Sequence, residues 1–470
     1  MTGRPPVAQA STPLPPLPPL GADAPFTLPR ATTRQLGPGL RLIAVPRADT
    51  STVDVRVQIP YVARDARDTA LAELLTAVLF SGTARLGTHT VRWDTALRTG
   101  RLQARRTTEW LVIAGHCRSD ELPHLLALLG ERLACPDHDE DLVRAQAERI
   151  ARAAEVLRTD PRRTALRTLR RLRHGDLGCF EDLPAGGAAD PPTAREVAAA
   201  HVRLLTRPPA EVLLVGGVNA QTAAEPVRRA FAHRQGCPLP DPALPAPLPA
   251  ARPAAGAGPR RVVVHRPASA QSTLALAWDC LPFEDSRHTA QAVANAVFSG
   301  YFSSRLVARL REREGLTYQA TSRFDRVLGT MSVVLEASCA PAETERTVRA
   351  VLDEARRMVT DPPTPAETAH ARRFLAGSLL MATASPTDLA NLVSSLSCWG
   401  VGVGWTEEYP RRLALTSDGE VARAAARVFG RPPTAVAVGD PAALTEPLGR
   451  LGFVPHGAPP SPAPTKTGTT

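Results

Sequence analysis

The feature that most limits how this chain can fold is an internal repeat. Arg207-Pro-Pro-Ala-Glu-Val-Leu-Leu-Val-Gly-Gly recurs 224 positions later as Arg431-Pro-Pro-Thr-Ala-Val-Ala-Val-Gly-Asp. A pair of alternating, strand-like segments that begins at Leu42 recurs in the same order at Val262. Two matches at nearly the same spacing indicate a tandem duplication in which each copy forms one structural unit.

A proline-rich segment separates the two copies. Residues 237–260, CPLPDPALPAPLPAARPAAGAGPR, carry Pro, Ala and Gly with almost no periodic pattern, which is typical of an interdomain linker. We therefore predict an N-terminal domain over residues 26–236 and a C-terminal domain over residues 261–455. Residues 1–25, which are rich in proline, and residues 456–470 are expected to be disordered tails.

Each copy combines strand and helix patterns. The coarse order is a strand pair, a helix, strands, long helices, a strand and a helix. In the first copy, residues 102–116 are expected to form two strands, and residues 139–172 long helices that break at Pro161. In the second copy we expect strands over residues 317–322 and 330–338 and helices over residues 342–360 and 366–382. The predicted class is α+β, with two similar α/β-roll domains, each a mostly antiparallel sheet packed with helices.

The basic charge does not by itself indicate a nucleic-acid partner, and we expect none. The formal net charge is +10, but the 56 basic residues are scattered arginines, apart from the single lysine, Lys466. Aromatic residues make up only 4% of the chain, which is few for a base-stacking surface. The densest basic stretch, Arg162 to Arg173, is interpreted as a solvated helix face, with a surface for acidic partners as the weaker alternative.

Cysteine usage and hydropathy favour a cytoplasmic protein. The seven cysteines are widely spaced, odd in number and form no Cys-x-x-Cys, so reduced thiols are expected rather than a disulfide framework. Residues 1–25 lack the continuous apolar run of a secretory signal, and no apolar run of 18 residues is present to span a membrane. We expect no membrane contact.

Three short motifs resemble one enzyme family. Gly39-Leu40-Arg41 opens the first copy, and residues 72–87, AELLTAVLFSGTARLG, form an expected buried helix that Gly82 ends. The second copy has Ser303-Ser304-Arg305-Leu306 on an expected helix over residues 303–314, followed by Arg311-Glu312-Arg313-Glu314-Gly315-Leu316-Thr317-Tyr318. On these motifs, residues 36–455 resemble the pitrilysin/insulinase family of inverted-zincin peptidases in its small two-domain form. The resemblance implies that the two domains form half of a clamshell chamber.

The same resemblance shows what the first copy lacks. The family's His-x-x-Glu-His zinc motif, placed on the helix, falls on Glu73, Thr76 and Ala77, and its third ligand falls at Ala153–Ala154. Carboxylates without imidazoles hold Zn²⁺ poorly. We therefore expect this chain to bind no metal, and the resemblance implies that zinc belongs to a partner subunit.

The second copy retains the other half of the site. In the family, the arginine and tyrosine at the positions of Arg311 and Tyr318 hold the substrate main chain and donate to the developing oxyanion. Because Gly315 is expected to end the helix between them, both side chains should face one cleft. The alternative interpretation is that they are an ordinary surface residue and an ordinary strand residue.

These expectations lead to two hypotheses about function. The leading one is the non-zinc subunit of a heterodimeric, peptide-cleaving metallopeptidase, in which Arg311 and Tyr318 act in trans beside the zinc of a homologous partner. Its peptide would bind by strand addition to a sheet edge, and precursor or leader peptides are a candidate substrate class. The alternative is a wholly non-catalytic scaffold or peptide-binding homologue in which the Arg and Tyr are remnants of the fold.

Overall fold

The computed structural model describes most of both copies. The described residues are 30–61, 63, 65–80, 101–134, 136, 138–175, 191–206, 209–232, 261–402 and 404–456. The predicted tails up to residue 25 and from residue 457, the predicted linker over residues 237–260, and the turn residues Ser81 to Thr83 lie outside these ranges. The predicted domain boundaries therefore stay predictions.

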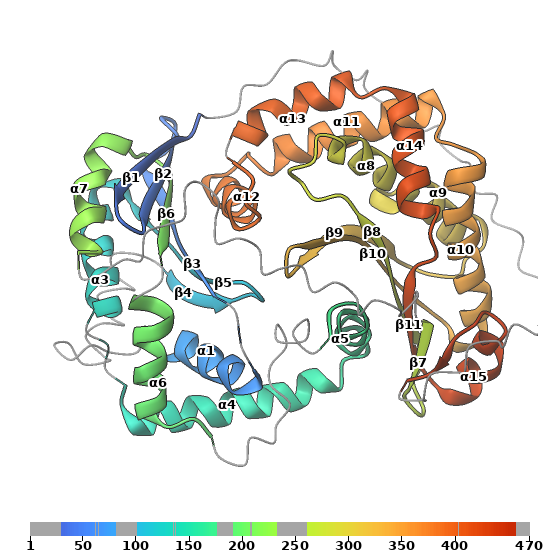
Figure 1. Ribbon diagram of the computed structural model, residues 1–470, viewed down its shortest axis with the longest axis horizontal. Coiled ribbons are helices and arrows are strands. Elements are labelled where there is room, and N and C mark those ends of the chain that lie inside the picture. The colour runs from blue at the N-terminus through green and yellow to red at the C-terminus, as the bar shows by residue number, and fades with distance from the viewer. Residues whose placement is uncertain are drawn as a thin grey trace, which may run out of the picture.

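Two six-stranded sheets form the framework, one in each half of the chain (Figure 1). In order across the first sheet, the strands are β1 (Thr32–Gly37), β2 (Leu40–Pro46), β6 (Ala210–Gly216), β3 (Thr52–Pro60), β5 (Trp110–Arg118) and β4 (Arg101–Arg106). In order across the second sheet, they are β12 (Val454–Pro455), β7 (Arg261–His265), β11 (Thr434–Gly439), β8 (Ser272–Cys280), β10 (Thr330–Cys339) and β9 (Ala320–Val327).

The two sheets share one topology over five strands. In both, a parallel pair (β2 with β6, and β7 with β11) is followed by three antiparallel strands that end at an edge strand, β4 or β9. Only the outermost strand differs: β1 lies antiparallel to β2, whereas β12, from the end of the described chain, lies parallel to β7. The predicted α+β class, with mostly antiparallel sheets and a duplicated unit, is confirmed.

Helices cover one face of each sheet and build its main hydrophobic core. The helices of the first half are α1 (Ala66–Val78), α3 (Leu122–Ala134), α4 (Glu140–Arg158), α5 (Pro161–His174), α6 (Ala194–His201) and α7 (Ala220–Ala230). Those of the second half are α8 (His288–Asn295), α9 (Arg305–Val307), α10 (Thr344–Thr360), α11 (Pro365–Met381), α12 (Pro386–Cys398), α13 (Gly404–Leu415), α14 (Asp418–Phe429) and α15 (Pro441–Gly449). None of the helices in the described ranges is long and apolar enough to cross a bilayer.

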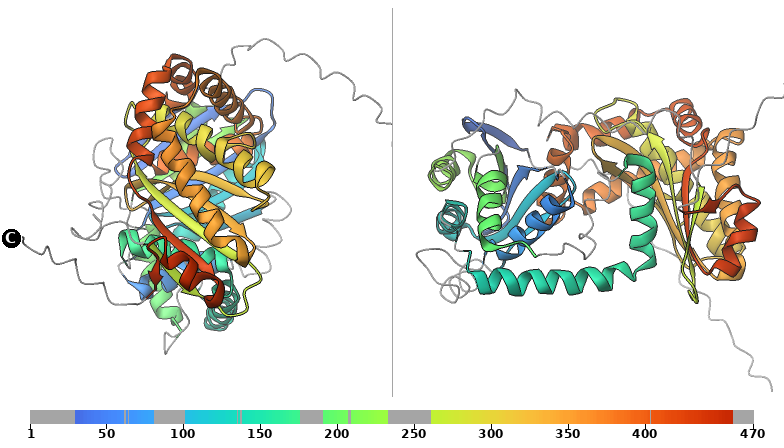
Figure 2. Two further views of the ribbon diagram at one scale, coloured as in Figure 1. Left: turned by 90° about the vertical axis from the view of Figure 1, so that its right-hand side faces the viewer. Right: turned by 60° about the horizontal axis from the view of Figure 1, so that its bottom comes forward.

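The other face of each sheet is covered by a helix from the opposite half. Helix α5 packs Ala165 and Leu169 against the second sheet, in a cluster with Val436 and Val438 of β11. Helix α12 packs Leu389 and other apolar residues against the first sheet, in a cluster with strands β2 and β6. Figure 1 shows α12 beside the first sheet and α5 beside the second, and Figure 2 shows the long helix α4 that carries the chain across to α5. The two halves are thus joined by a reciprocal exchange of helices.

Local sequence sets the start of both exchanged helices. Asp160 caps α5 by accepting a hydrogen bond from the Arg162 amide (2.9 Å), and Pro161 occupies the first helical position. Ser385 caps α12 in the same way through the Asp388 amide (3.0 Å), ahead of Pro386. Proline tolerates the first position because its missing N–H would have had no partner there. The break predicted at Pro161 lies where the sequence analysis placed it.

Candidate functional site

A tight turn ahead of β9 brings Arg311 and Tyr318 together. Helix α9 continues into a π-helical turn, η5 (Ala308–Arg313), whose Leu310 is fully buried. Gly315 then adopts a left-handed conformation (φ 61°), which glycine adopts without steric cost. The Leu316 amide donates to the Leu310 carbonyl (2.7 Å), so the chain reverses within a few residues. The helix end predicted at Gly315 is present.

The Arg311 guanidinium contacts two exposed aromatic rings. Its Cζ atom is 5.5 Å from the centroid of the Tyr318 ring and 4.5 Å from that of Phe302, both within cation–π range. Arg311 Nε is also 3.5 Å from a carboxylate oxygen of Glu312. Tyr318 is 85% exposed and Phe302 is 61% exposed, which is unusual for such large rings. The two residues named from the sequence are therefore adjacent and accessible, and Phe302, which sequence reasoning missed, completes the cluster.

Tyr318 also lines a groove to which both halves contribute. The groove encloses about 520 Å³, and its wall includes the first residues of β9, the end of β10 and Arg162 of the exchanged helix α5. Glu336 lies in this wall and forms ion pairs with both Arg162 and Arg323. The Arg311–Tyr318 pair thus stands beside a concave surface whose walls come from both copies of the repeat.

Tyr318 precedes the edge strand rather than starting it. The strand expected from Thr317 begins at Ala320, so that part of the prediction is wrong. The reason is local: the Thr317 hydroxyl donates to the carbonyls of Ser338 (2.6 Å) and Gln319 (2.9 Å), and this side-chain bonding replaces the strand ladder. Tyr318 is consequently freed from the pleat and projects into solvent.

Arg305, part of the same motif, has a structural role. Its guanidinium donates to both carboxylate oxygens of Glu367 (2.6 and 2.7 Å) and to the backbone carbonyls of Asp361 (2.7 Å) and Pro362 (3.2 Å). The hydrogen bonds from Arg305 lower the pKa of Glu367 to about 2, so this charge pair persists across the physiological range. Arg305 ties the turn that carries Arg311 to the start of α11.

The three degenerate zinc positions lie on α1, opposite the edge strand β4. Glu73 forms an ion pair with Arg106 of β4 (2.8 Å between Oε2 and Nε), and the Arg106 side chain is only 2% exposed. The Thr76 hydroxyl donates to the Glu73 carbonyl (2.8 Å), within the helix itself. Ala77 offers no ligand atom. The cation nearest the one remaining carboxylate is therefore a buried guanidinium supplied by the chain.

These residues do not fit a zinc ion. Zinc in proteins needs three or four Cys, His or carboxylate ligands, whereas Glu73, Thr76 and Ala77 supply one carboxylate that is already paired. At the predicted third-ligand position, Ala154 is buried and Ala153 is partly buried, and neither side chain has a donor atom. Across the described ranges, no group of three or more His, Cys, Asp and Glu side chains is placed to hold a metal.

The basic helix α5 is not the solvated face expected from the sequence. Three of its arginines pair with acidic residues of the second sheet, one on each of three adjacent strands. The pairs are Arg162 with Glu336 (2.5 Å), Arg170 with Asp325 (3.2 Å) and Arg173 with Asp279 (2.5 Å). The expectation is wrong for this face because α5 belongs to the second sheet, which no periodicity within residues 162–173 could reveal.

The match to a family model spans the end of the first half and much of the second. Residues 193–375 match the family model described as the peptidase M16 inactive domain. A curated relative, an uncharacterized zinc protease of Streptomyces coelicolor, is 28% identical over 231 residues. That alignment covers 48% of this chain and 49% of the relative, so the similarity spans about half the length of each protein.

Solved structures share the fold over nearly the whole chain. The peptidase M16 inactive domain from Pseudomonas fluorescens superposes with a TM-score of 0.74 at 20% identity, covering 87% of this chain and 98% of that one. A protease from Helicobacter pylori gives a TM-score of 0.75 at 18% identity, covering 88% and 100%. Part of the chain is thus similar in sequence to M16 peptidases, and most of it shares the fold of these solved structures, while Glu73, Thr76 and Ala77 stand where the resemblance places the His-x-x-Glu-His motif.

Proposed function

We propose that this protein is the non-zinc subunit of a heterodimeric metallopeptidase. It would contribute Arg311 and Tyr318 to a peptide-cleaving centre whose zinc is held by a homologous partner. The observation that carries the proposal is the contrast between the two halves. The zinc position of the first is filled by the Glu73–Arg106 ion pair, whereas the Arg311–Tyr318 pair of the second is accessible.

The chemistry of the pair suits an oxyanion. A guanidinium is permanently charged and a phenol is a neutral donor, so both can stabilise the negative oxygen that forms when water attacks a peptide carbonyl. The Tyr318 hydroxyl makes no hydrogen bond to any residue in the described ranges, so its proton is available to a ligand. The Phe302 ring also contacts the guanidinium, which limits the entropy lost when substrate binds.

The surroundings suit an extended peptide. Strand β9 is the outermost strand of the second sheet and begins two residues after Tyr318. An edge strand presents unpaired backbone donors and acceptors, to which a peptide can add as a further strand. The groove beside Tyr318 would then receive side chains of the bound peptide. The finer proposal, that the substrates are precursor or leader peptides, rests on the family resemblance alone.

The test uses the assembled pair. The tagged chain would be co-expressed with homologues that retain His-x-x-Glu-His, and a stable complex would be assayed on a quenched fluorescent peptide library. We expect Arg311→Ala and Tyr318→Phe each to lower turnover by about 10²- to 10³-fold, the effect of removing one oxyanion donor. Arg313→Ala and Tyr301→Phe are matched controls, because they remove an exposed arginine and a phenol hydroxyl from neighbouring positions outside the cluster.

The outcomes distinguish a catalytic role of Arg311 and Tyr318 from a purely structural one. Size-exclusion chromatography would first establish that each variant still assembles with its partner. If assembled complexes carrying Arg311→Ala and Tyr318→Phe keep the rates of the controls, the catalytic role is wrong. The cluster is then explained by its own cation–π packing, as in the alternative of a non-catalytic scaffold or peptide-binding homologue. A neighbouring reading frame with an intact His-x-x-Glu-His would favour the enzyme, and its absence would favour the alternative.

A further inference from the structure

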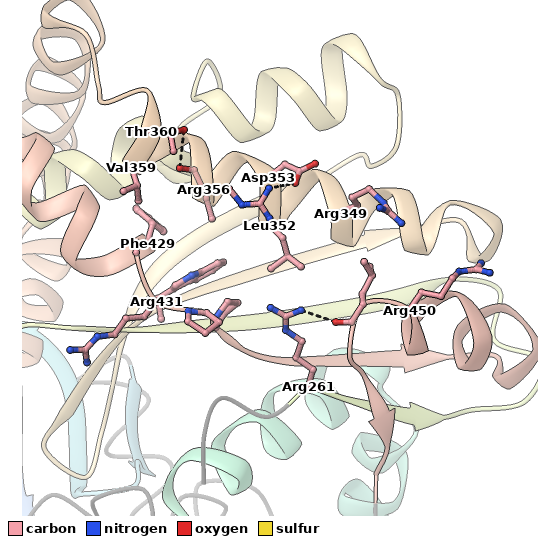
Figure 3. A pocket seen from close by; sticks show the side chains of 16 residues that line it. Arg261, Arg349, Leu352, Asp353, Arg356, Val359, Thr360, Phe429, Arg431 and Arg450 are labelled. Atoms are coloured by element: carbon pink, nitrogen blue, oxygen red, sulfur yellow. Dashed lines mark hydrogen bonds and ion pairs between the residues drawn. The ribbon is translucent and has the colours of Figure 1, made fainter. Parts of the chain in front are cut away.

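A second difference between the two halves is a cavity on the helix-covered side of the second sheet. It encloses about 650 Å³ between α10, the start of β7 and the segment that follows α15, and it lies within the size range of small-molecule sites. Figure 3 shows Arg261 rising from β7 toward Leu352 and Arg356 of α10. Val359 and Phe429 lie together at one end of the cavity, and Arg349 and Arg450 at the other.

Among the described residues, the first half is closely packed at the matching place. Gly130 of α3 lies so close to α7 that an added Cβ would be 2.3 Å from the Ala230 carbonyl oxygen. Both halves contain a Cys-x-x-x-Glu sequence, which begins at Cys117 in the first and at Cys339 in the second. When the two are aligned, Leu352 falls at the position of Gly130. The Glu-Pro pairs of α7 and α15 likewise place Leu451 at the position of Ala230. Both residues line the cavity, so two bulkier side chains stand where Gly130 and Ala230 lie close together in the first half.

An arginine lines the cavity at a position where the first half has a core leucine. In the first sheet, Leu42 of β2 lies opposite Val212 and is fully buried on the helix-covered face. The residue that holds this place in the second sheet is Arg261, opposite Ala435 of the matching strand. Burial alone lowers the pKa of Arg261, and its guanidinium donates to the Leu451 carbonyl (2.7 Å) rather than to a carboxylate. Leu42 shows that an apolar side chain fills this position in the first sheet, so packing alone does not explain Arg261 in the second.

The charge in the cavity is unbalanced. Five of its lining residues are arginines, at positions 261, 349, 356, 431 and 450, and one is an acid, Asp353. Glu345 is shared between Arg349 (2.5 Å) and Arg450 (3.2 Å), and Glu446 is 3.3 Å from Arg450. Counting these three carboxylates against five guanidinium groups leaves an excess of two positive charges among the described residues. A compact ligand with at least two negative charges would neutralise it.

A polar group in the wall also lacks a partner. Trp278 lines the cavity, is 2% exposed, and its indole N–H forms no hydrogen bond within the described part of the chain. A buried donor without an acceptor is destabilising, so native structures rarely leave one unless a ligand or water supplies the acceptor. Within the described residues, the Trp278 indole has no acceptor and Arg261 has no carboxylate partner, and these two independent observations both favour an anionic acceptor in the same cavity.

We propose that this cavity is a binding site for a small phosphorylated molecule that carries two or more negative charges. Arg261, Arg349 and Arg450 hold the phosphate groups, since the guanidinium fork matches phosphate oxygens in pairs. Val359, Phe429 and the prolines Pro432 and Pro433 provide an apolar end for the remainder of the ligand. The site lies on the helix-covered side of the second sheet, whereas α5 and the Tyr318 groove lie toward its other side.

Isothermal titration calorimetry with inorganic tripolyphosphate tests the proposal on the full chain at low salt. We expect one binding event per chain, and at least about a tenfold loss of affinity in Arg261→Leu, which restores the first-half residue. Arg450→Gln, on an exposed side chain, should also weaken binding severalfold and keeps the test valid if Arg261→Leu unfolds. The matched control is Arg229→Gln, because Arg229 pairs with Glu225 on α7 as Arg450 pairs with Glu446 on α15.

Three results would overturn the proposal. The first is no heat of binding by the wild-type chain at millimolar tripolyphosphate. The second is an equal loss of affinity in Arg229→Gln and Arg450→Gln, which would mean diffuse attraction to a basic surface. The third is equally tight binding of citrate, which would show that the site selects charge and not phosphate.

Discussion

The two copies of the repeat place different side chains, with different partners, at one matching helix position. Glu73 in α1 and Gln291 in α8 occupy matching places, each seven residues before the phenylalanine of a Phe-Ser-Gly sequence. In the first copy the side chain is charged and pairs with the buried guanidinium of Arg106. In the second copy Gln291 is neutral, accepts from the Leu281 amide (2.9 Å) and donates to the Leu281 carbonyl (3.2 Å). The lesson is that one backbone supports an electrostatic or a neutral site, and neither version supplies a set of zinc ligands.

The exchanged helices show the same divergence. Helix α5 is held on the second sheet by arginine–carboxylate pairs, whereas α12 is held on the first by apolar packing around Leu389 and Val393. Polar contacts of α12 are hydrogen bonds to buried groups, such as the Thr387 hydroxyl with Asp54 (2.9 Å) and the Arg56 guanidinium with Asn391 (3.1 Å). We therefore expect the two halves to respond differently to mutation, salt and pH.

The largest effect is expected where the first copy keeps its charge pair. Glu73→Ala removes a carboxylate from the buried Arg106 and should lower the free energy of unfolding by about 3–5 kcal/mol. Urea unfolding followed by circular dichroism measures it. The double variant Glu73→Leu with Arg106→Leu should recover most of the loss, because apolar side chains of similar size replace a buried ion pair well. A double variant as unstable as Glu73→Ala would contradict the ion-pair explanation.

Truncating the apolar contact of α12 should come next. Leu389 is 2% exposed and packs against β2 and β6, so Leu389→Ala should cost about 2–4 kcal/mol through lost burial and a cavity. The loss should be the same in low and high salt, as measured by urea unfolding in both. A loss that shrinks with added salt would mean that α12 is held by charge, as α5 is.

The matching change in α5 should be smaller and dependent on salt. Arg170 and Asp325 are partly buried (15% and 17% exposed), so Arg170→Gln should cost about 1–2 kcal/mol at low salt. Added sodium chloride should reduce the difference from wild type, because salt screens the pair that the variant has lost. Arg163→Gln, whose side chain is 50% exposed, is the matched control and should change stability by less than about 0.5 kcal/mol.

The smallest effect is a pH dependence from two buried histidines on helices that pack on the second sheet. Burial lowers the pKa of His174 and of His288 to about 4, in His174 with help from the Arg173 charge. The unfolded chain binds these protons near pH 6.5 and the folded chain does not, so stability is full above that value and falls as pH drops toward 4. From about pH 7.5 to about pH 6, each histidine should remove about 0.8 kcal/mol.

The substitution His288→Phe tests how much of this pH dependence comes from one histidine. His288→Phe, in a pocket between Phe283 and Phe324, should remove about half of the pH dependence. Hydrogen exchange at the two pH values should show the loosening in the second sheet and α5 rather than in the first sheet. An unchanged pH slope in His288→Phe would mean that other groups titrate in this range.

Much of the local structure follows from the sequence, and most of the long-range contacts do not. The end of α4, the start of α5 at Pro161 and the turn at Gly315 depend on neighbouring residues, and proline and glycine mark them. The exchange of α5 and α12 cannot be predicted in this way, because an amphipathic pattern shows that a helix is buried and not which sheet buries it.

In the candidate site too, local motifs could be predicted from the sequence and long-range contacts could not. Arg311 and Tyr318 are close in the sequence and could be named from a short motif, as could the empty zinc positions. Arg106 could not be named, since it lies on a different element from Glu73, and the β4–α1 contact decides that the two meet. The shift of β9 to Ala320 was missed because the Thr317 hydroxyl competes with the strand ladder.

The most direct test of the contrast between the halves is the zinc content of the chain. The purified protein would be incubated with excess zinc at neutral pH, desalted and measured by plasma mass spectrometry, alone and as a complex with a His-x-x-Glu-His partner. Because Glu73 is paired with the Arg106 guanidinium, we predict well below one zinc per chain alone and, under the proposed function, one zinc per heterodimer. One zinc retained per isolated chain, lost on mutation of Glu73, would contradict it.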